Sequence, residues 1–195
     1  MRVVAGKARG TKLKTPAEDM PVRPTSDRVK EALFSAVQFD ICGEVLDLFA
    51  GSGQLGIEAL SRGADFAVFC DHEQRSIDLI AFNVGKVHME AQSEIRLTDY
   101  KRYLRHDCHR RFHLVLIDPP YGTGLSDRAL SYVAEGTCLD ADAVVAVECP
   151  ADEKKPERVG VLALYRRYTY GTVSFAVYRR ESGTDESHSA LPGEL

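Results

Sequence analysis

The sequence predicts an α/β fold: a doubly wound, mostly parallel sheet of seven strands, of which the last two form an antiparallel hairpin. From residue 43 onward, strand-length apolar runs alternate with segments whose apolar residues recur every three or four positions. This pattern is typical of parallel strands joined by helices. Acidic residues recur where the predicted strands end, and a Tyr170-Gly171-Thr172 turn separates the last two apolar runs.

The first predicted strand covers residues 44–49, and the glycine-rich segment 50–53 interrupts it. A helix over 55–61 follows, and Gly63 is expected to end it because glycine readily adopts the left-handed conformation found after helices. The second strand covers 66–70. The helix after it is expected to bury one stripe of apolar residues against the sheet: Ile77, Ile80, Ala81, Val84 and Val87.

Six further elements complete the predicted core. They are a weaker third strand over 94–97, a fourth strand over 112–117, a helix over 126–134, a fifth strand over 143–148, and the hairpin strands 159–168 and 173–178. The polar run 105–111 is expected to be an exposed loop, and the arginine pairs of the hairpin are expected to lie on a solvated edge.

The segment before this core predicts a small extension. Residues 2–6 and 11–14 alternate like a short hairpin with Gly10 at its turn. Residues 24–27, Pro-Thr-Ser-Asp, predict a helix start with a hydroxyl as N-cap, followed by apolar residues at helical spacing: Val29, Leu33, Ala36 and Val37. We therefore divide the chain into a basic extension (1–40), an α/β domain (41–181) and a polar, disordered tail (182–195).

Composition excludes several classes of protein. The 195 residues, 44% of them hydrophobic, are enough for one globular domain with a real core. The longest apolar runs are far shorter than the roughly 20 residues of a membrane-spanning helix. The N-terminus lacks the apolar region of a secretory signal, so a cytoplasmic protein is predicted. Five cysteines with no Cys-x-x-Cys pair indicate neither disulfides nor a zinc ribbon.

The charge is distributed unevenly. Residues 1–30 contain eight basic and three acidic side chains, a charge of +5, so the rest of the chain carries −9 of the total of −4. A basic segment on an acidic protein fits contact with a phosphate backbone, although a solvated arm would have the same charge. The predicted RNA-binding residues all come from this segment: Arg2, Lys7, Arg9, Lys12, Lys14, Arg23 and Thr25.

The functional site is expected at the carboxyl edge of the sheet, where ligands of open α/β folds bind. Asp47, the glycines of segment 50–53, Asp71, Asp99 and Asp118 should converge there. Glycines let the backbone approach a ligand, and Asp71 can accept ribose hydroxyls. Dinucleotide enzymes use the same logic, but Asp47 inside the first strand disfavours a pyrophosphate. It favours a cation such as the sulfonium of S-adenosylmethionine.

The tetrapeptide Asp118-Pro119-Pro120-Tyr121 indicates chemistry on an amine. The prolines fix φ and remove two amide donors, which leaves the Pro119 carbonyl held in a set direction. This carbonyl and the Asp118 carboxylate can each accept one hydrogen of an NH2 group and so orient its lone pair. Tyr121 offers a flat face for an unstacked base. A tight turn after a strand would explain the prolines but not the acid and the aromatic residue beside them.

These motifs resemble a known family. Segment 47–53, Asp71, Asp99 and the tetrapeptide 118–121 look like the motifs of amino-methyltransferases, while residues 1–6 and 23–34 resemble the RsmD family. The resemblance covers residues 1 to about 180. It implies a Rossmann-like class I methyltransferase that transfers a methyl group from S-adenosylmethionine to guanine N2 in 16S ribosomal RNA, leaving S-adenosylhomocysteine.

The resemblance also implies roles for individual residues. The methionine end of the donor would contact Asp47, Ala50, Gly51 and Gly53, while Asp71 would hold the ribose and Asp99 the adenine amine. Phe49, His72 and Tyr100 are further predicted cofactor contacts, although His72-Glu73 departs from the longer, more basic stretch of many relatives. Asp118 and Pro119 would hold the guanine amine, with Pro120 and Tyr121 completing the catalytic edge. Arg23 and Thr25 could approach either the donor or the RNA.

Two alternatives to this function stay open. The same tetrapeptide permits another amine as substrate, such as DNA adenine or a protein glutamine, and the fold could also serve an RNA-binding assembly factor without turnover. No metal site is predicted, because His106, Cys108, His109 and His113 match no zinc spacing. The expected partner is 16S ribosomal RNA in a small-subunit particle. No membrane, no obligate protein partner and a monomeric state are expected.

Overall fold

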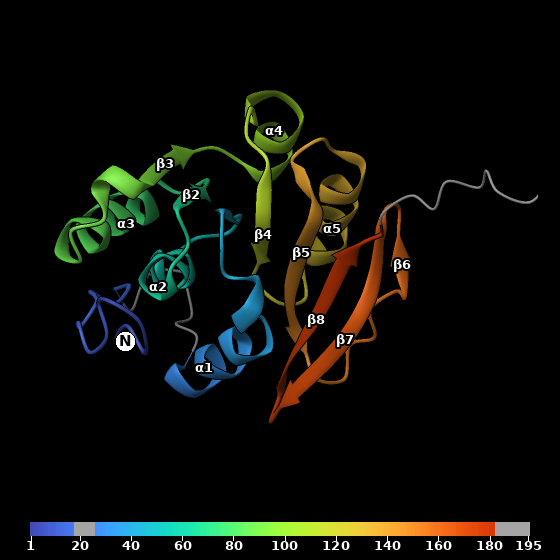
Figure 1. Cartoon of the computed structure of the whole chain (residues 1–195), viewed down its shortest axis with the longest axis horizontal. Helices are drawn as coiled ribbons and strands as arrows, with labels where there is room; N and C mark the ends of the chain where they lie inside the picture. Colours follow the sequence, from blue (N-terminus) through green and yellow to red (C-terminus); the bar gives the residue numbers. More distant parts are fainter. Residues whose placement is uncertain (18–25, 182–195) are drawn as a thin grey trace, which may run out of the picture.

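The computed structural model describes residues 1–17 and 26–181 of the chain, and these form an eight-stranded sheet with helices on both faces (Figure 1). The strand order is β3-β2-β1-β4-β5-β8-β7-β6. The first five strands in this order run parallel to one another, whereas β8 is antiparallel to β5 and the pairs β8–β7 and β7–β6 are also antiparallel. The predicted doubly wound α/β sheet with a terminal antiparallel hairpin is therefore confirmed.

The elements follow one another as the alternating pattern predicts. The strands are β1 (Glu44–Asp47), β2 (Phe66–Asp71), β3 (Ser93–Leu97), β4 (Phe112–Ile117), β5 (Leu139–Pro150), β6 (Arg158–Val159), β7 (Leu162–Tyr170) and β8 (Val173–Arg180). The α-helices are α1 (Asp27–Ala36), α2 (Gln54–Arg62), α3 (Gln74–Lys86), α4 (Tyr100–Arg102) and α5 (Leu125–Glu135). Short 3-10 turns lie at η1 (Gln38–Asp40) and η2 (Glu90–Gln92), and η3 (Tyr103–Asp107) is a π-helical turn.

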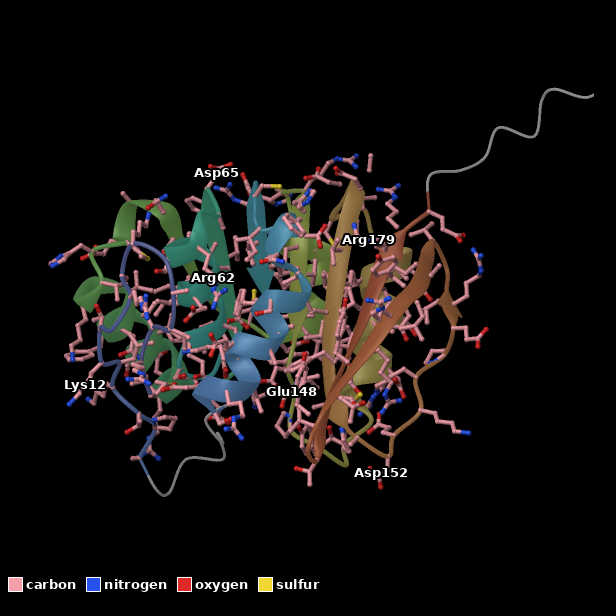
Figure 2. The ribbon with its side chains drawn as sticks, turned by 60° about the horizontal axis from the view of Figure 1, so that its bottom comes forward. Lys12, Arg62, Asp65, Glu148, Asp152 and Arg179 are labelled. Atoms are coloured by element: carbon pink, nitrogen blue, oxygen red, sulfur yellow. The ribbon has the colours of Figure 1, made fainter. Side chains whose placement is uncertain are left out.

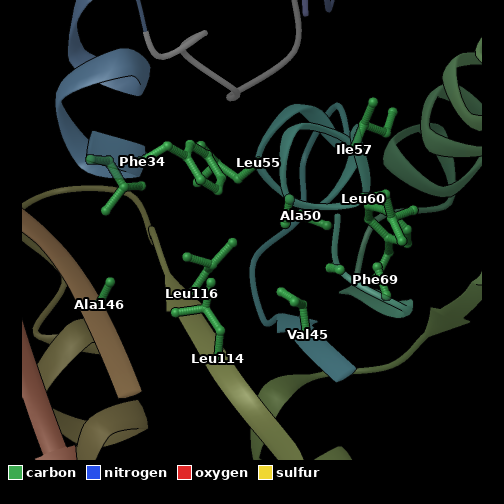
Figure 3. Packing of buried hydrophobic residues seen from close by; sticks show 14 of the residues in the cluster. Phe34, Val45, Ala50, Leu55, Ile57, Leu60, Phe69, Leu114, Leu116 and Ala146 are labelled. Atoms are coloured by element: carbon green, nitrogen blue, oxygen red, sulfur yellow. The ribbon is translucent and has the colours of Figure 1, made fainter. Parts of the chain in front are cut away.

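Two hydrophobic cores lie on opposite faces of the sheet, because successive strand residues point to opposite sides. On one face, Val45 and Leu116 pack with residues of α1, α2 and α3, as Figure 3 shows for Phe34, Leu55 and Leu60 among others. On the other face, Leu46 and Val115 pack against α5 and η3. Both faces of the central parallel strands are covered, which explains the apolar runs of β2 and β4, whereas the edge strand β3 is partly exposed.

The strand register brings the predicted acidic residues to one edge. Asp47 pairs with Phe69 on β2 and with Leu116 on β4, so Asp71 and Asp118 each lie two residues beyond its level. Asp71 in turn pairs with Leu97, which places Asp99 two residues beyond that level on the chain leaving β3. All four aspartates therefore lie at the carboxyl ends of neighbouring parallel strands.

The N-terminal segment packs into the main core rather than standing apart from it. Arg2 and Lys12 form the bridge of the predicted hairpin, whose Val3 and Leu13 side chains are buried in the core that α1–α3 cover. Helix α1 begins at the predicted N-cap, where the Ser26 hydroxyl accepts a hydrogen bond from the Val29 amide. The boundary at residue 40 stays a prediction, as does the disordered tail, which lies outside the described residues.

Three expectations about the strands and loops need correction. The sheet has eight strands instead of seven, because Gly160 adopts a positive φ of 53° and splits the run 159–168 into β6 and β7. Strand β5 is twelve residues long and begins well before Ala143. The run 105–111 is not simply a loop, since its first residues belong to the π-helical turn η3.

The buried face of α3 also differs from the predicted stripe. Ala81 is exposed, whereas Asn83 is fully buried. Asn83 is buried because its side chain donates to the carbonyls of Ser52 and Lys14 and accepts the Lys14 amide. This residue therefore ties α3 to both the glycine-rich segment and the N-terminal segment.

Two of the hairpin arginines donate hydrogen bonds to backbone carbonyls, so they are not simply solvated as expected. Arg167 donates to the carbonyls of Pro150 and Ala151, and Arg180 donates to those of Leu139 and Asp140. These bonds fasten β7 and β8 to the two ends of β5. Among residues 1–17 and 26–181, no helix combines the length and the apolar character needed to cross a bilayer.

Candidate active site

Asp47 ends β1 as a buried acid, and its side chain is only half satisfied. Its Oδ2 accepts the Gly56 amide at 2.9 Å, while Oδ1 has no hydrogen-bond partner within the described parts of the chain. Burial raises the pKa of Asp47 to about 7, the nearby charge of Asp71 adds to this rise, and the Gly56 hydrogen bond opposes it. A cation arriving beside Oδ1 would favour the ionised form, so this acid is suited to holding positive charge.

The glycine-rich segment turns tightly from β1 into α2. Gly51 and Gly53 have φ values of +55° and +77°, which side chains rarely tolerate, and the Gly53 amide bonds the Ala50 carbonyl at 2.6 Å. A Cβ on Gly56 would lie 2.3 Å from the Phe69 ring, so glycine lets α2 approach β2 closely. The positions of Gly51, Gly53 and Gly56 thus each serve a distinct structural need.

Asp71 is joined to this turn. Its Oδ2 accepts the Gly51 amide at 2.8 Å and its Oδ1 accepts the Glu73 amide at 2.9 Å. The carboxylate therefore keeps a fixed orientation, and each oxygen retains a lone pair for a hydroxyl donor. His72 follows it on the surface, with 69% of its side chain exposed and Nδ1 3.6 Å from Asp71 Oδ1. Cofactor contact by His72 stays a prediction.

An acid and a pair of aromatic rings lie beyond the ends of β3 and β1. Asp99 is the N-cap of α4, where its Oδ1 accepts the Arg102 amide at 3.0 Å, so one oxygen of this predicted adenine contact is already used. Tyr100 packs against Phe49, with ring centroids 5.4 Å apart. The two predicted aromatic contacts therefore form one cluster beside the ends of β1 and β3.

The tetrapeptide 118–121 directly follows β4 and lines a pocket. Asp118 is partly buried and Pro119 buried, whereas 45% of Tyr121 is exposed. The pocket has a volume of about 310 Å3, within the lower range of small-ligand sites. It is lined by Pro119, Pro120, Tyr121, Gly122, Thr123, Gly124, Ser126, Asp127, Glu148, Pro150 and Glu153. Asp118 and Leu55, in the first turn of α2, border a second, narrow gap. The Leu48 amide also bonds the Leu116 carbonyl, so the tetrapeptide that leaves β4 runs beside the segment that leaves β1 toward the glycine turn.

Sequence reasoning missed one acid of this site. Glu148, near the end of β5, is only 8% exposed, and its Oε1 accepts the Tyr121 hydroxyl at 2.7 Å. Its Oε2 has no hydrogen-bond partner among the described residues. Burial raises the pKa of Glu148, and hydrogen bonds with Tyr121 and Asp118 partly offset that rise. The available signal was an acid at the end of an otherwise apolar strand, the same signal that singled out Asp47.

The basic N-terminal residues are not all free to meet RNA. Arg9 and Lys12 are exposed, and Figure 2 shows Lys12 on the N-terminal segment, well apart from Glu148. Arg2 pairs with Asp27 at 2.9 Å, Lys7 donates to Gln92 and Lys14 lies over the Phe82 ring. Lys30, which contributed to the charge count, is fully buried beside Glu58. Arg23 and Thr25 lie outside the described residues, and RNA contact stays a prediction for the whole set.

No group of three or more histidine, cysteine, aspartate or glutamate side chains in the described ranges is arranged to hold a metal ion. Cys108 is half-buried beside Cys138, and the hydrogen bond between them is the largest cause lowering the pKa of Cys108 to about 7. This pair lies on the face covered by η3 and α5, away from the glycine turn.

Comparison with known proteins shows the family to which the chain is similar. A family model described as "Conserved hypothetical protein 95" matches residues 1–179. YlbH of Bacillus subtilis is 35% identical, with 92% of this chain and 99% of YlbH covered. The ribosomal RNA small subunit methyltransferase D of Haemophilus influenzae is 33% identical, with 92% and 93% covered.

A solved structure shares the fold closely. The Escherichia coli protein yhhF superposes with a TM-score of 0.82 at 30% identity, covering 93% of this chain and 98% of that protein. Together with the strand order, this likeness identifies the predicted Rossmann-like class I methyltransferase fold. The match of the family model over nearly the whole described core leads to one conclusion: the chain belongs to the family of "Conserved hypothetical protein 95", which includes the ribosomal RNA small subunit methyltransferases D.

Proposed function

We propose that this protein transfers a methyl group from S-adenosylmethionine to the exocyclic N2 amine of a guanine in 16S ribosomal RNA. The observation that carries the proposal is that the tetrapeptide 118–121 adjoins both the glycine turn and a pocket of about 310 Å3. This arrangement supports a site in which the amine acceptors would lie next to the bound donor. Relatives named ribosomal RNA small subunit methyltransferase D support ribosomal RNA as the substrate.

The residues at the carboxyl edge fit a nucleoside donor that carries positive charge. Asp47 is a buried acid with one oxygen that no described residue bonds, which suits the ammonium or sulfonium of S-adenosylmethionine. Gly51 and Gly53 keep the turn beside it free of side chains, and the fixed Asp71 carboxylate can accept ribose hydroxyls. Asp99, with one oxygen left for an adenine amine, and the Phe49–Tyr100 pair would hold the base.

The tetrapeptide would position the acceptor. Asp118 and the Pro119 carbonyl would each accept one hydrogen of the guanine amine, and Tyr121 would stack on the ring. When bound, S-adenosylmethionine supplies an electrophilic methyl group. The oriented amine nitrogen would gain this methyl group as the sulfur–carbon bond breaks and would lose one proton to solvent, giving S-adenosylhomocysteine and N2-methylguanine. Positioning and electrostatics would account for most of the rate.

The proposed setting follows from this substrate. Exposed Arg9 and Lys12 would contact RNA phosphates, and the substrate would be met in the cytoplasm as part of a small-subunit particle. We expect the protein to act as a monomer without an obligate protein partner.

The direct experiment offers labelled S-adenosylmethionine with small-subunit ribosomal RNA, both naked and as reconstituted particles, and analyses the nucleosides of the product. Adenine-containing DNA and protein substrates are tested in parallel. We expect labelled N2-methylguanosine in the ribosomal RNA and no label in the DNA or protein substrates. Mapping then locates the accepting guanine. Label on adenine or glutamine, or binding of RNA with no transfer in either form, would contradict the proposal.

A further inference from the structure

Glu148 is a buried acid to which neither the fold nor the proposed reaction assigns a role. It lines the pocket next to the tetrapeptide and also borders the gap that contains Asp118. Figure 2 shows it at the end of β5 beside α1. A buried carboxylate oxygen without a partner costs free energy, so an acid kept at this position calls for a hydrogen-bond donor that binding would supply.

The donor pattern of guanine matches this position. The Watson–Crick edge of guanine places the N1–H donor next to the N2 amine, whereas adenine has an acceptor at N1. If Asp118 and Pro119 hold the N2 amine, the neighbouring N1–H faces the next acceptor along the site. Glu148 is that acceptor by position, since it contacts both Tyr121 and Asp118.

We propose that Glu148 is the specificity-determining residue of this site, and that its carboxylate accepts N1–H of the target guanine. The inference rests on the proposed function and adds the means by which guanine is chosen over bases without an N1 proton. A carboxylate facing the adenine N1 would place two acceptors against each other, which disfavours that base.

Tyr121 supplies the movement that this contact needs. Glu148 Oε2 is covered, and Oε1 holds the Tyr121 hydroxyl. Because 45% of Tyr121 is exposed, this side chain has room to turn onto an incoming base. Once the tyrosine has turned away, the base N1–H reaches the carboxylate and bonds Oε2, the oxygen that no described residue bonds.

The experiment compares two bases in the same RNA. The accepting guanine, once mapped, is replaced by 2-aminopurine, which keeps the 2-amine but has an acceptor at N1. In Glu148→Gln, the amide NH2 can donate to that acceptor, while the amide oxygen is only a neutral and therefore weaker acceptor of N1–H. We expect transfer to guanine to fall by about 10- to 100-fold, with transfer to 2-aminopurine unchanged or higher. The guanine preference should therefore shrink by at least about tenfold.

Two further variants separate this role from a structural one. Glu148→Asp keeps an acceptor and should retain the guanine preference at a lower rate. Tyr121→Phe removes the hydroxyl but not the carboxylate, and it should alter transfer to both bases alike. Donor affinity and thermal stability of each variant show that the fold is intact.

The outcomes are distinct. An unchanged guanine preference in a folded Glu148→Gln protein, or equal loss on both bases, would overturn the assignment of Glu148 while the wild-type reaction stands. If the wild-type protein transfers no methyl group to guanine, the proposed function itself fails.

Discussion

Asp47 is held in an environment that opposes its charge. Because burial raises its folded pKa to about 7, the native protein binds a proton at this side chain over a pH range in which an unfolded aspartate is already ionised. The native state therefore binds more protons than the unfolded state between about pH 4 and 7. The stabilisation of the native state by the protonated Asp47 side chain is therefore fully present below pH 4 and is lost as the pH rises through 7.

Asp47→Asn isolates this contribution, because the amide keeps the shape of the side chain but does not titrate. Relative to the variant, the wild-type free energy of unfolding should fall by on the order of 4 kcal/mol between pH 4 and 8. Urea unfolding at a series of pH values measures the difference. A constant difference across this range would mean that Asp47 has an ordinary pKa, and the argument for a cation beside Oδ1 would lose its support.

The residues of the site differ in how far the sequence could predict them. Asp47, Asp71 and Asp118 were recognisable because each closes an apolar strand, and the register indeed brings them to one edge. Glu148 closes a strand in the same way, but its pairing with Tyr121 depends on β5 lying next to β4, which no local pattern specifies. The capping role of Asp99 depends likewise on a three-residue helix too short to leave a periodic signal.

At the scale of elements, α2 joins the glycine turn to the N-terminal segment. Its Glu58 is fully buried and accepts the amides of Val4 and Ala5 at 2.8 and 2.9 Å. The same carboxylate lies 3.4 Å from Lys30 Nζ of α1 and 2.9 Å from Arg62 Nε. Burial lowers the pKa of Lys30, and the negative charge of Glu58 opposes this decrease. One acid thus fastens three segments together.

Glu58→Gln should therefore be strongly destabilising. It leaves the Lys30 charge buried without a counter-charge, and breaking a buried pair from one side costs about 3–5 kcal/mol. The double variant Glu58→Gln with Lys30→Met should recover part of that loss, since the fully buried Lys30 charge is removed and only Arg62, which is 15% exposed, loses its counter-charge. Chemical unfolding of the three proteins checks this. Equal stability of wild type and Glu58→Gln would show that the Glu58–Lys30 pair does not stabilise the contact between α1 and α2.

Elements with strong periodicity could be predicted from the sequence, and elements set by distant contacts could not. Strand β4 has the predicted bounds because a continuous apolar run reports burial on both faces. The buried face of α3 differed because Asn83, a polar residue, is buried by its bonds to Ser52 and Lys14. The extra strand β6 arose because a single glycine turn, at Gly160, redirected the chain.

For the molecule as a whole, the charge distribution is the feature most relevant to a nucleic-acid substrate. The +5 charge of residues 1–30 includes Lys30, which is buried, so the sequence count overstates the charge that RNA could meet. Deleting this segment would also remove Val3 and Leu13 from the core. Neutralising exposed side chains is therefore a cleaner test than truncation.

The double variant Arg9→Gln with Lys12→Gln should weaken RNA binding for all sequences alike and reduce the salt dependence of binding by about two counterions. Donor affinity should stay unchanged. Arg158→Gln is the matched control, since Arg158 lies on β6 at the far edge of the sheet (Figure 1). Binding titrations at several salt concentrations give the slopes. If the salt dependence of binding in the double variant equals that of wild type, RNA contacts another part of the surface.

If the tetrapeptide holds the amine while the glycine turn and Asp47 hold the donor, Asp118→Ala should slow methyl transfer without weakening donor binding. Two quantities are measured on this variant: the rate of methyl transfer to small-subunit ribosomal RNA and the affinity for S-adenosylmethionine. We expect a rate lower by at least about 100-fold with donor affinity within about threefold of wild type. Comparable loss of both, or a rate close to wild type, would contradict this division of roles.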